Sequence, residues 1–364
     1  MIPRRHALKT TALMLAGLSP WSVSAGTDTD KFYPAVKPRP LVFPRDYGSH
    51  PEYRTEWWYL TGWLGQGSSA IGFQITFFRS RTRHASDNPS RLAPTQLLFA
   101  HAALAVAESN TFLHANRAGR MNRTSLRADT RDTDLQFEDW HFRRLPSGNT
   151  EVYQGRFSDQ GYAVTFEAST NQTPLLRGQD GLSAKGPDPI QASHYYSRAP
   201  LAVRAKVQVG QQTRNLSGTA WLDHEWSSQL LMPGAVGWDW LGINLLDGGT
   251  LMAFQIRNAR YEPLFTHVDA RGRDGQANMG WQGLKWQASG RWRAPSLIEY
   301  PVPMDLMVGD QLYQLVPLML LQEVDARTST GGYYWEGAVS LMQGERLLGR
   351  GYLELTGYGA PLRL

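Results

Sequence analysis

The chain has 364 residues, a formal net charge of +5 and no cysteine, which excludes disulfides, thiol catalysis, thiolate metal sites and a lipid-bearing N-terminal cysteine. Aromatic residues make up 11% of the chain, including 13 Trp, beside 35 Gly and 21 Pro. With no long helical stripe, this composition predicts an all-β protein of short strands and tight turns, long enough for two domains.

Residues 1–25 are predicted to be an export signal. Arg4 and Arg5 lie in a charged first segment, an apolar run follows, and Val23–Ala25 is typical of a cleavage site. The arginine pair followed by Leu8-Lys9 is similar to a twin-arginine signal, and a general secretory signal is the alternative. We therefore expect a periplasmic or otherwise exported protein.

Removing the signal also removes Arg4, Arg5 and Lys9, so the net charge falls to 5 − 3 = +2. A nucleic-acid partner is not expected at that charge. No other stretch has the roughly 20 apolar residues that span a bilayer, which predicts a soluble protein. Residues 26–50 contain Pro34, Pro38, Pro40 and Pro44, and we expect them to form an extended surface arm.

Strand-like runs begin after this arm, and the turn at residues 65–68 predicts a hairpin between the first two. The strands expected in the first half are Trp57–Leu64, Ala70–Phe78, Gln96–Ala107, Leu135–Arg143, Glu151–Phe157, Tyr162–Ala168 and Val203–Val209. Those expected in the second half are Trp238–Leu246, Leu251–Arg257, Phe265–Asp269, Trp281–Ala288, Leu297–Pro301, Gln311–Pro317, Tyr333–Leu341 and Leu348–Leu355.

An internal repeat relates the two halves. Trp57–Ile75 aligns without a gap on Trp238–Ile256, at an offset of 238 − 57 = 181 residues, with seven of nineteen positions identical. This offset is too long for a solenoid, so we expect two domains of one kind, at residues 51–225 and 226–364. A closed barrel is favoured for each, because closure removes exposed sheet edges and leaves room for an apolar ligand.

Three separated motifs carry a family resemblance: HPEYRTEWWYLTG at His50–Gly62, SHYYS at Ser193–Ser197, and AWLDHEWS at Ala220–Ser227 followed by GWDW at Gly237–Trp240. In this order they resemble the AttH/CrtC family, which contains AttH proteins associated with transporter gene clusters and carotenoid 1,2-hydratases, also called hydroxyneurosporene synthases. The resemblance implies two tandem lipocalin-like antiparallel β-barrels.

The segment from Trp221 to Trp226 is predicted to be a strand, which places His224 and Trp226 on one face and Asp223 and Glu225 on the other. Hydration of an isolated C=C bond needs an acid of raised pKa, a base that positions water, and a dry aromatic wall. Asp223 or Glu225 is the candidate acid and His224 the candidate base.

Trp226, Trp238 and Trp240 could stabilise a carbocation through their faces. The resemblance implies a catalytic His-x-Trp pair, which His224 and Trp226 match. The tyrosine and aspartate that the hydratases carry on a following strand have no counterpart here. The alternative is that the Asp-His-Glu cluster ties the two barrels together by hydrogen bonds and ion pairs.

Further residues are candidates for ligand binding, each with a structural alternative. His50 and Glu56 could close a polar site with Asp223 and Glu225, or form a salt-bridged entrance to the first strand. His101 lies in an apolar run and is more typical of a core histidine. The remaining candidates are Trp57, Trp238, Asp239 and Trp240, together with His194, Tyr195 and Tyr196, which are expected in a polar aromatic loop at a barrel mouth or packed on its rim.

Metal binding is not expected, because the histidines have no local ligand spacing. Nucleotide fingerprints and a serine-hydrolase elbow are also missing from the sequence. Two functions remain. The first is a carrier that binds a lipid or isoprenoid and delivers it to a membrane transporter permease. The second is a cofactor-independent lyase, similar to carotenoid 1,2-hydratase, that adds water to a terminal C=C bond.

Overall fold

The structure, a computed structural model, describes residues 33–85, 88–90, 92–122, 124–148 and 150–362. The expected export signal at residues 1–25 lies outside this part of the chain. The described residues form antiparallel strands joined by turns and short 3-10 helices. No helix among them is long and apolar enough to cross a membrane.

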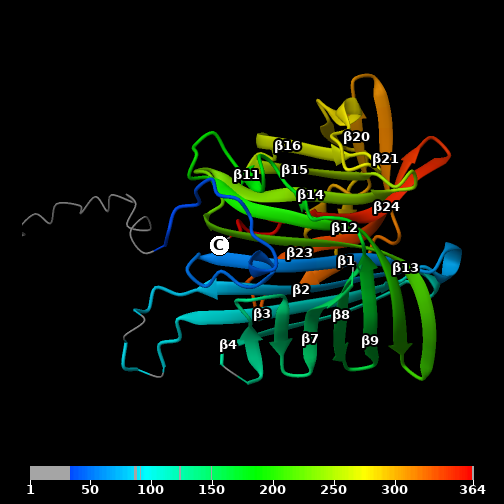
Figure 1. Cartoon of the computed structure of the whole chain (residues 1–364). Coiled ribbons are helices and arrows are strands. Elements are labelled where there is room, and N and C mark those ends of the chain that lie inside the picture. Colours follow the sequence, from blue (N-terminus) through cyan, green and yellow to red (C-terminus); the bar gives the residue numbers. More distant parts are fainter. Residues whose placement is uncertain (1–32, 86–87, 91, 123, 149, 363–364) are drawn as a thin grey trace, which may run out of the picture.

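The first half forms a 13-stranded sheet that curves into a nearly closed barrel (Figure 1). Its main strands are hydrogen-bonded in the order β4-β3-β2-β1-β13-β12-β9-β8-β7-β6-β5, and β10 and β11 pair with β12. The bounds are β1 Thr55–Leu64, β2 Ile71–Arg81, β3 Gln96–Val106, β4 Thr111–Arg120, β5 Leu126–Ala128, β6 Asp134–Phe137, β7 Trp140–Ser147, β8 Thr150–Asp159, β9 Tyr162–Thr170, β10 Leu175–Leu176, β11 Leu182–Ala184, β12 Ala192–Val209 and β13 Gln212–Gln229.

The second half forms a nine-stranded sheet that is a half-barrel. Its order is β16-β15-β14-β24-β23-β21-β20-β17, with β22 paired to β23 and a separate β18-β19 ribbon. The bounds are β14 Ala235–Leu245, β15 Thr250–Asn258, β16 Pro263–Arg271, β17 Lys285–Ala288, β18 Trp292–Arg293, β19 Glu299–Tyr300, β20 Met304–Val308, β21 Gln311–Pro317, β22 Glu323–Asp325, β23 Tyr333–Gln343 and β24 Arg346–Leu355. The predicted all-β class with two lipocalin-like barrels is confirmed.

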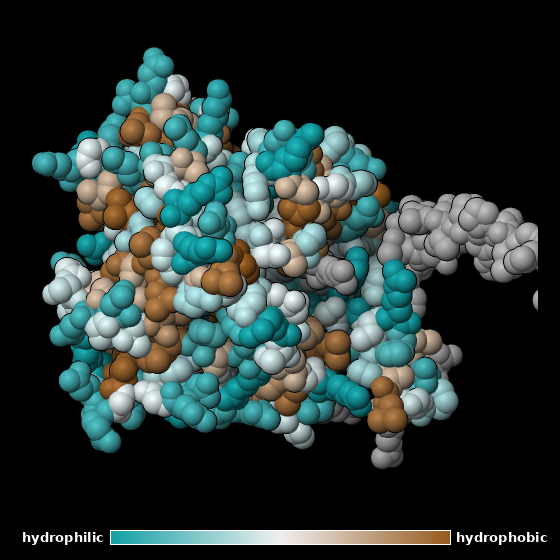
Figure 2. Space-filling model, turned by 180° about the vertical axis from the view of Figure 1, so that it is seen from behind, coloured by the Kyte–Doolittle hydropathy of each residue, from teal (hydrophilic) through white to brown (hydrophobic). Residues whose placement is uncertain are grey.

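Each sheet buries its own apolar core through the two-residue period of its strands. In β9, for example, buried and more exposed residues alternate from Tyr162 to Thr170. Phe73, Phe142 and Phe166 pack inside the first sheet, and Leu241, Trp335 and Leu353 pack inside the second. On the outer face in Figure 2, hydrophobic residues form small patches between hydrophilic ones.

Several sequence-based expectations differ from the structure. Trp281–Ala288 is not one strand, because Trp281 ends a 3-10 helix and β17 begins only at Lys285. Leu135–Arg143 is not one strand, because the chain turns at Glu138, which has a positive φ of 56°, and forms the β6–β7 hairpin. Ser193–Ser197 is not a loop but part of the long strand β12, where all five residues are buried. The arm is not wholly on the surface, since Val36, Tyr47 and His50 are buried against the first sheet.

The two sheets meet along a seam, which we define as the layer where β1 and β13 face β24 and β14. Two equivalent hydrogen bonds cross it in opposite directions. The Trp63 indole donates to the Gly351 carbonyl at 2.9 Å, and the Asn244 amide donates to the Ala220 carbonyl at 3.1 Å. The donors are 244 − 63 = 181 residues apart, which is the offset of the sequence repeat. The two halves therefore face each other with approximate twofold symmetry.

Candidate functional site

A pocket with an empty volume of about 780 Å³, part of it open to solvent, lies at the seam. Strands from both sheets supply its walls, so neither barrel could form it alone. Its lining is aromatic and aliphatic except for one threonine, one lysine and four carboxyl groups. The lining residues are Thr55, Trp57, Tyr59, Phe78, Lys185, Asp223, Glu225, Leu230, Trp238, Trp240, Phe254, Ile256, Glu336 and Glu354.

Four aromatic side chains at equivalent positions of the repeat form the walls of the pocket. Trp57 and Trp238 have nearly parallel rings, with centroids 6.5 Å apart and planes at 15°. Two residues further along each strand, Tyr59 and Trp240 meet edge to face at 5.2 Å. Side chains two apart in a strand share a face, which explains why each pair points into the seam.

Asp223, on β13, lines the pocket and is fixed by three hydrogen bonds. Its carboxylate accepts hydrogen bonds from the Tyr195 hydroxyl at 2.6 Å, the Trp221 indole at 2.7 Å and the Ser197 hydroxyl at 2.5 Å. Burial raises the pKa of Asp223 to about 6, against the lowering effect of these bonds and of the Arg177 charge. The carboxyl can therefore exist in either protonation state near neutral pH.

Glu225 forms an ion pair inside the pocket. Lys185 Nζ lies 2.9 Å from Glu225 Oε1, which also accepts a hydrogen bond from Ser193. The same ammonium lies over the Phe254 ring at 4.1 Å and the Tyr195 ring at 4.9 Å. The protein thus already holds one cation here with a carboxylate and aromatic faces.

Glu336 and Glu354 are directly opposite each other on β23 and β24. The Trp238 indole donates to Glu354 Oε2 at 3.1 Å. Burial, with smaller contributions from Asp223 and Glu225, raises the pKa of Glu354 to about 7. Burial and the Glu354 charge raise the pKa of Glu336 well above its usual range. The pair can therefore hold and exchange a proton near neutral pH.

Asp223 and Glu354 occupy equivalent positions in the two halves. Asp223 is paired with Tyr59 across β13 and β1, and Glu354 is paired with Trp240 across β24 and β14. Each acid ends an aromatic-Leu-acid sequence, WLD in β13 and YLE in β24, at an offset of 354 − 223 = 131 residues. The repeat has therefore placed one carboxyl from each half beside the same pocket, Asp223 fully buried and Glu354 half-buried.

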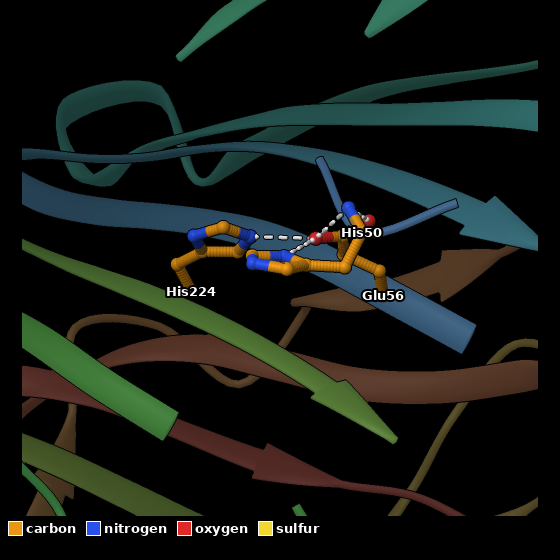
Figure 3. A group of neighbouring side chains, drawn as sticks. All are labelled: His50, Glu56 and His224. Atoms are coloured by element: carbon orange, nitrogen blue, oxygen red, sulfur yellow. Dashed lines mark hydrogen bonds and ion pairs between the residues drawn. The ribbon is translucent and has the colours of Figure 1, made fainter. Parts of the chain in front are cut away.

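His224 and Trp226 point away from this pocket, toward the arm. Glu56 Oε1 lies 2.7 Å from His50 Nδ1 and 3.0 Å from His224 Nε2 (Figure 3). The His50 ring stacks on the Trp226 indole with centroids 3.7 Å apart. The expected catalytic set is thus divided between the two faces of β13, and its four members do not form one cluster.

The charges of this second cluster are balanced. Burial would raise the pKa of Glu56, but Arg79 and His50 outweigh it and hold the pKa well below the usual range. Burial would lower the pKa of His50, but Glu56 and Asp46 outweigh it and raise the pKa, so both ring nitrogens donate. Burial lowers the pKa of His224 to about 4, so this ring is neutral.

His50, Glu56 and His224 could in principle hold a metal ion, since their ligand atoms lie within 4.8 Å of one another. However, Glu56 Oε1 already accepts hydrogen bonds from both rings, and its other oxygen is 2.7 Å from Arg79 Nε. A metal ion would need His50 deprotonated and would displace these bonds. The geometry fits a buried hydrogen-bond network better than a metal centre.

The remaining candidates lie outside the pocket. His194 and Tyr196 are on the side of β12 that faces the arm. His194 lies beside Trp226, and Tyr196 lies beside His224. Tyr195 lies behind the pocket and bridges Asp223 and the Trp240 indole. Asp239 faces the opposite side of β14, where it binds Gln255 and Arg257.

His101 lies elsewhere, in a contact between the two halves. Its Nδ1 is 2.8 Å from the Tyr334 hydroxyl, and its Nε2 is 2.8 Å from the Ser329 hydroxyl. Burial lowers its pKa to about 3. It is thus a buried, neutral histidine that lies outside the pocket.

Lys185, Glu336 and Glu354 were missed by sequence reasoning. The repeated aromatic-Leu-acid sequence could have indicated Glu354, whereas Lys185 and Glu336 belong to no motif.

Fold and site together define a lipocalin-like protein of two tandem antiparallel sheets with an aromatic, carboxyl-lined pocket at their seam. The model of the AttH-like family matches residues 34–358, and the chain belongs to that family. A crystal structure from Nitrosomonas europaea, described as an AttH, is 37% identical, has a TM-score of 0.79, and covers 89% of this chain and 99% of its own.

A more distant similarity supports the fold alone. Kievitone hydratase from Nectria haematococca is 11% identical with a TM-score of 0.64, and the match covers 88% of this chain and 93% of that one. No curated protein matches the chain.

Proposed function

We propose that the protein binds an elongated apolar molecule, a lipid or an isoprenoid, in the pocket at the seam. The observation that carries this proposal is the wall formed by Trp57, Tyr59, Trp238 and Trp240 from both halves. Pockets of this composition gain affinity from apolar burial, while a few polar groups set the orientation of the ligand.

The half-buried state of the two paired tryptophans also supports binding. Trp57 and Trp238 are neither fully buried nor exposed, whereas Trp221 and Trp240 beneath them are buried. A ligand that entered between the sheets would cover the two outer indoles and reach the inner ones. Binding therefore adds apolar burial that the protein without ligand lacks.

Native mass spectrometry of the purified chain tests this function directly. We expect a co-purified apolar molecule, or a 1:1 complex with an added fatty alcohol, and a weaker complex for Trp238→Ala. Trp286→Ala, which alters an indole on β17 away from the pocket, is the matched control. Equal binding by the wild type and by Trp238→Ala would remove the pocket as the site.

Hydration of a C=C bond is a second candidate, favoured by the carboxyls of raised pKa in an aromatic pocket. Protonated Glu354 or Asp223 would donate its proton to one alkene carbon, leaving a tertiary cation on the other. Water would add to that cation and return a proton to a carboxylate, so the net reaction adds H₂O and needs no cofactor. Incubation with an acyclic carotenoid and detection of the tertiary alcohol tests it.

Export and delivery to a membrane permease complete the proposal for a carrier. They rest on the charged and apolar pattern of residues 1–25 and on the resemblance of the motifs. Cell fractionation is the test, and it should recover a shortened chain outside the cytosol. Recovery of the full-length chain in the cytosol would remove the export step and leave ligand binding in place.

A further inference from the structure

We propose that the ligand carries a cationic group, bound between Glu336 and Glu354 at the β23–β24 side of the pocket. This inference rests on the proposed function and adds the chemical class of the ligand, an amphiphile with an ammonium-type head. The two carboxyls would hold the head, and the aromatic walls would hold the apolar chain.

Among the residues that the structure describes, two of the four carboxyls that line the pocket lack the cationic neighbour that the other two have. Glu225 is neutralised by Lys185 at 2.9 Å, and the Arg177 charge acts on Asp223. Within the described part of the chain, neither Glu336 nor Glu354 forms an ion pair with a lysine, arginine or histidine. Glu336 is buried and Glu354 is half-buried, and burial favours the protonated form of both carboxyls. A cation bound between them would supply the partner that lets them ionise.

An unsatisfied atom independently points to a ligand. Glu336 is 2% exposed and lines the pocket, yet its Oε1 has no hydrogen-bond partner among the described residues. Tyr59, Tyr334 and Gln74 lie near enough to Glu336 to lower its pKa, and the buried Tyr59 hydroxyl also lacks a hydrogen-bond partner within the described ranges. Buried polar atoms rarely remain unsatisfied, so a ligand donor directed at Glu336 Oε1 explains this geometry.

The aromatic walls suit a cation as well as an apolar chain. Trp57, Trp238 and Trp240 line the same pocket as the two carboxyls, and indole faces attract ammonium groups. Lys185 shows this arrangement within the molecule, since its ammonium is held by Glu225 and the Phe254 ring. The β23–β24 side offers the same chemistry without a lysine.

Three ten-carbon probes with different heads test the inference: decylammonium, 1-decanol and decanoate. Their affinities for the full chain are measured by isothermal titration at pH 8. We expect decylammonium to bind about tenfold tighter than decanol, in line with a charge-assisted contact in a desolvated site, and decanoate to bind weakest.

Substitutions then locate the head group. Glu336→Gln and Glu354→Gln should each lower the ratio of decylammonium to decanol affinity toward one. Glu345→Gln, in the exposed β23–β24 turn, is the matched control and should keep the ratio. A ratio near one in the wild type, or a high ratio that both pocket variants retain, would overturn the inference.

The probes also separate this inference from the proposed function. If decanol binds the wild type, binds Trp238→Ala more weakly, and binds as tightly as decylammonium, then apolar binding in the pocket stands. Only the cationic head of the ligand is overturned. If none of the three probes binds, the proposed function fails and the inference fails with it.

The pH dependence supplies a second readout. Decylammonium stays charged between pH 5 and 8, while Glu354 must lose its proton to pair with it, so affinity should rise through about pH 7. The other titratable groups that line the pocket or whose charges act on Glu354 are Glu336, Asp223, Glu225, Tyr59, Lys185 and Tyr334, together with Asp239 from the opposite side of β14. A flat affinity over this range would contradict the pairing.

Discussion

Trp57 and Trp238 occupy equivalent positions in the two halves of the chain, and their rings lie nearly parallel across the seam, 6.5 Å apart. An alignment of the sequence with itself had paired the same two residues. The duplication therefore supplied both walls of one pocket, because each half contributes the start of its first main strand to the seam.

Replacing either wall should weaken ligand binding more than it weakens the fold. Trp238→Ala removes an aromatic face worth about 1–2 kcal/mol of contact, so we expect roughly tenfold lower affinity for an apolar probe. Quenching of the remaining tryptophans measures the affinity, and Trp286→Ala is the control. An unchanged affinity would show that the ligand does not contact this wall.

The buried Glu56 cluster should be important for stability. Glu56→Gln leaves Arg79 and protonated His50 buried without their carboxylate, which typically costs about 3–5 kcal/mol of unfolding free energy. Urea denaturation measures the change. Glu52→Gln alters a partly exposed carboxyl nearby and should shift stability by less than about 0.5 kcal/mol. Similar stabilities for the two variants would contradict the role of the cluster.

Glu354 should make the folded state less stable as the pH rises. Its pKa is raised to about 7 in the fold, so the folded state holds this proton more tightly than the unfolded state. The contribution of Glu354 to the unfolding free energy is fully present below the ordinary carboxyl pKa, and it is lost as the pH rises through about 7. His224, with its pKa lowered to about 4, acts in the opposite direction.

Because these effects overlap, we compare the wild type with Glu354→Gln. The unfolding free energy of the wild type minus that of the variant should fall by roughly 2 kcal/mol between pH 5 and pH 8. Chemical denaturation at several pH values measures this difference. A constant difference would mean that the carboxyl is not protonated in the fold.

If the protein hydrates an acyclic carotenoid, we expect the carboxyls that line the pocket to determine the rate of hydration. Glu354→Gln or Asp223→Asn removes the proposed acid, and a loss of about a hundredfold or more in kcat is expected for at least one of them. Product analysis by chromatography gives the rate. If both variants keep the wild-type rate, these carboxyls are not the acid.

The fold was predictable from the sequence because its signals are local and repeated. Period-two patterning around Trp57–Leu64 and Trp238–Leu246 gave strands at the right places, and the repeat indicated two similar units. Alternation along β13 correctly separated Asp223 from His224. The Ser193–Ser197 segment was mistaken for a loop, because its polar side chains pair with Asp223 and Glu225 inside the protein, a contact that a single strand does not show.

The site was only partly predictable, because it exists only where the two sheets meet. Trp57, Asp223, Glu225, Trp238 and Trp240 were candidates and all line the pocket. Lys185, Glu336 and Glu354 come from segments far apart in the chain, and no local spacing relates them. His50 and Glu56 did join His224, but on the face of the sheet that the pocket does not reach.

Photo-crosslinking tests the central claim most directly. A fatty alcohol that carries a diazirine is bound to the full chain, irradiated, and its attachment sites are mapped by peptide mass spectrometry. The account predicts labels on peptides that contain Trp57, Trp238 or Phe254, and their loss when excess unlabelled alcohol is added. Labels confined to other surfaces, or labels that competition does not remove, would contradict a binding site at the seam.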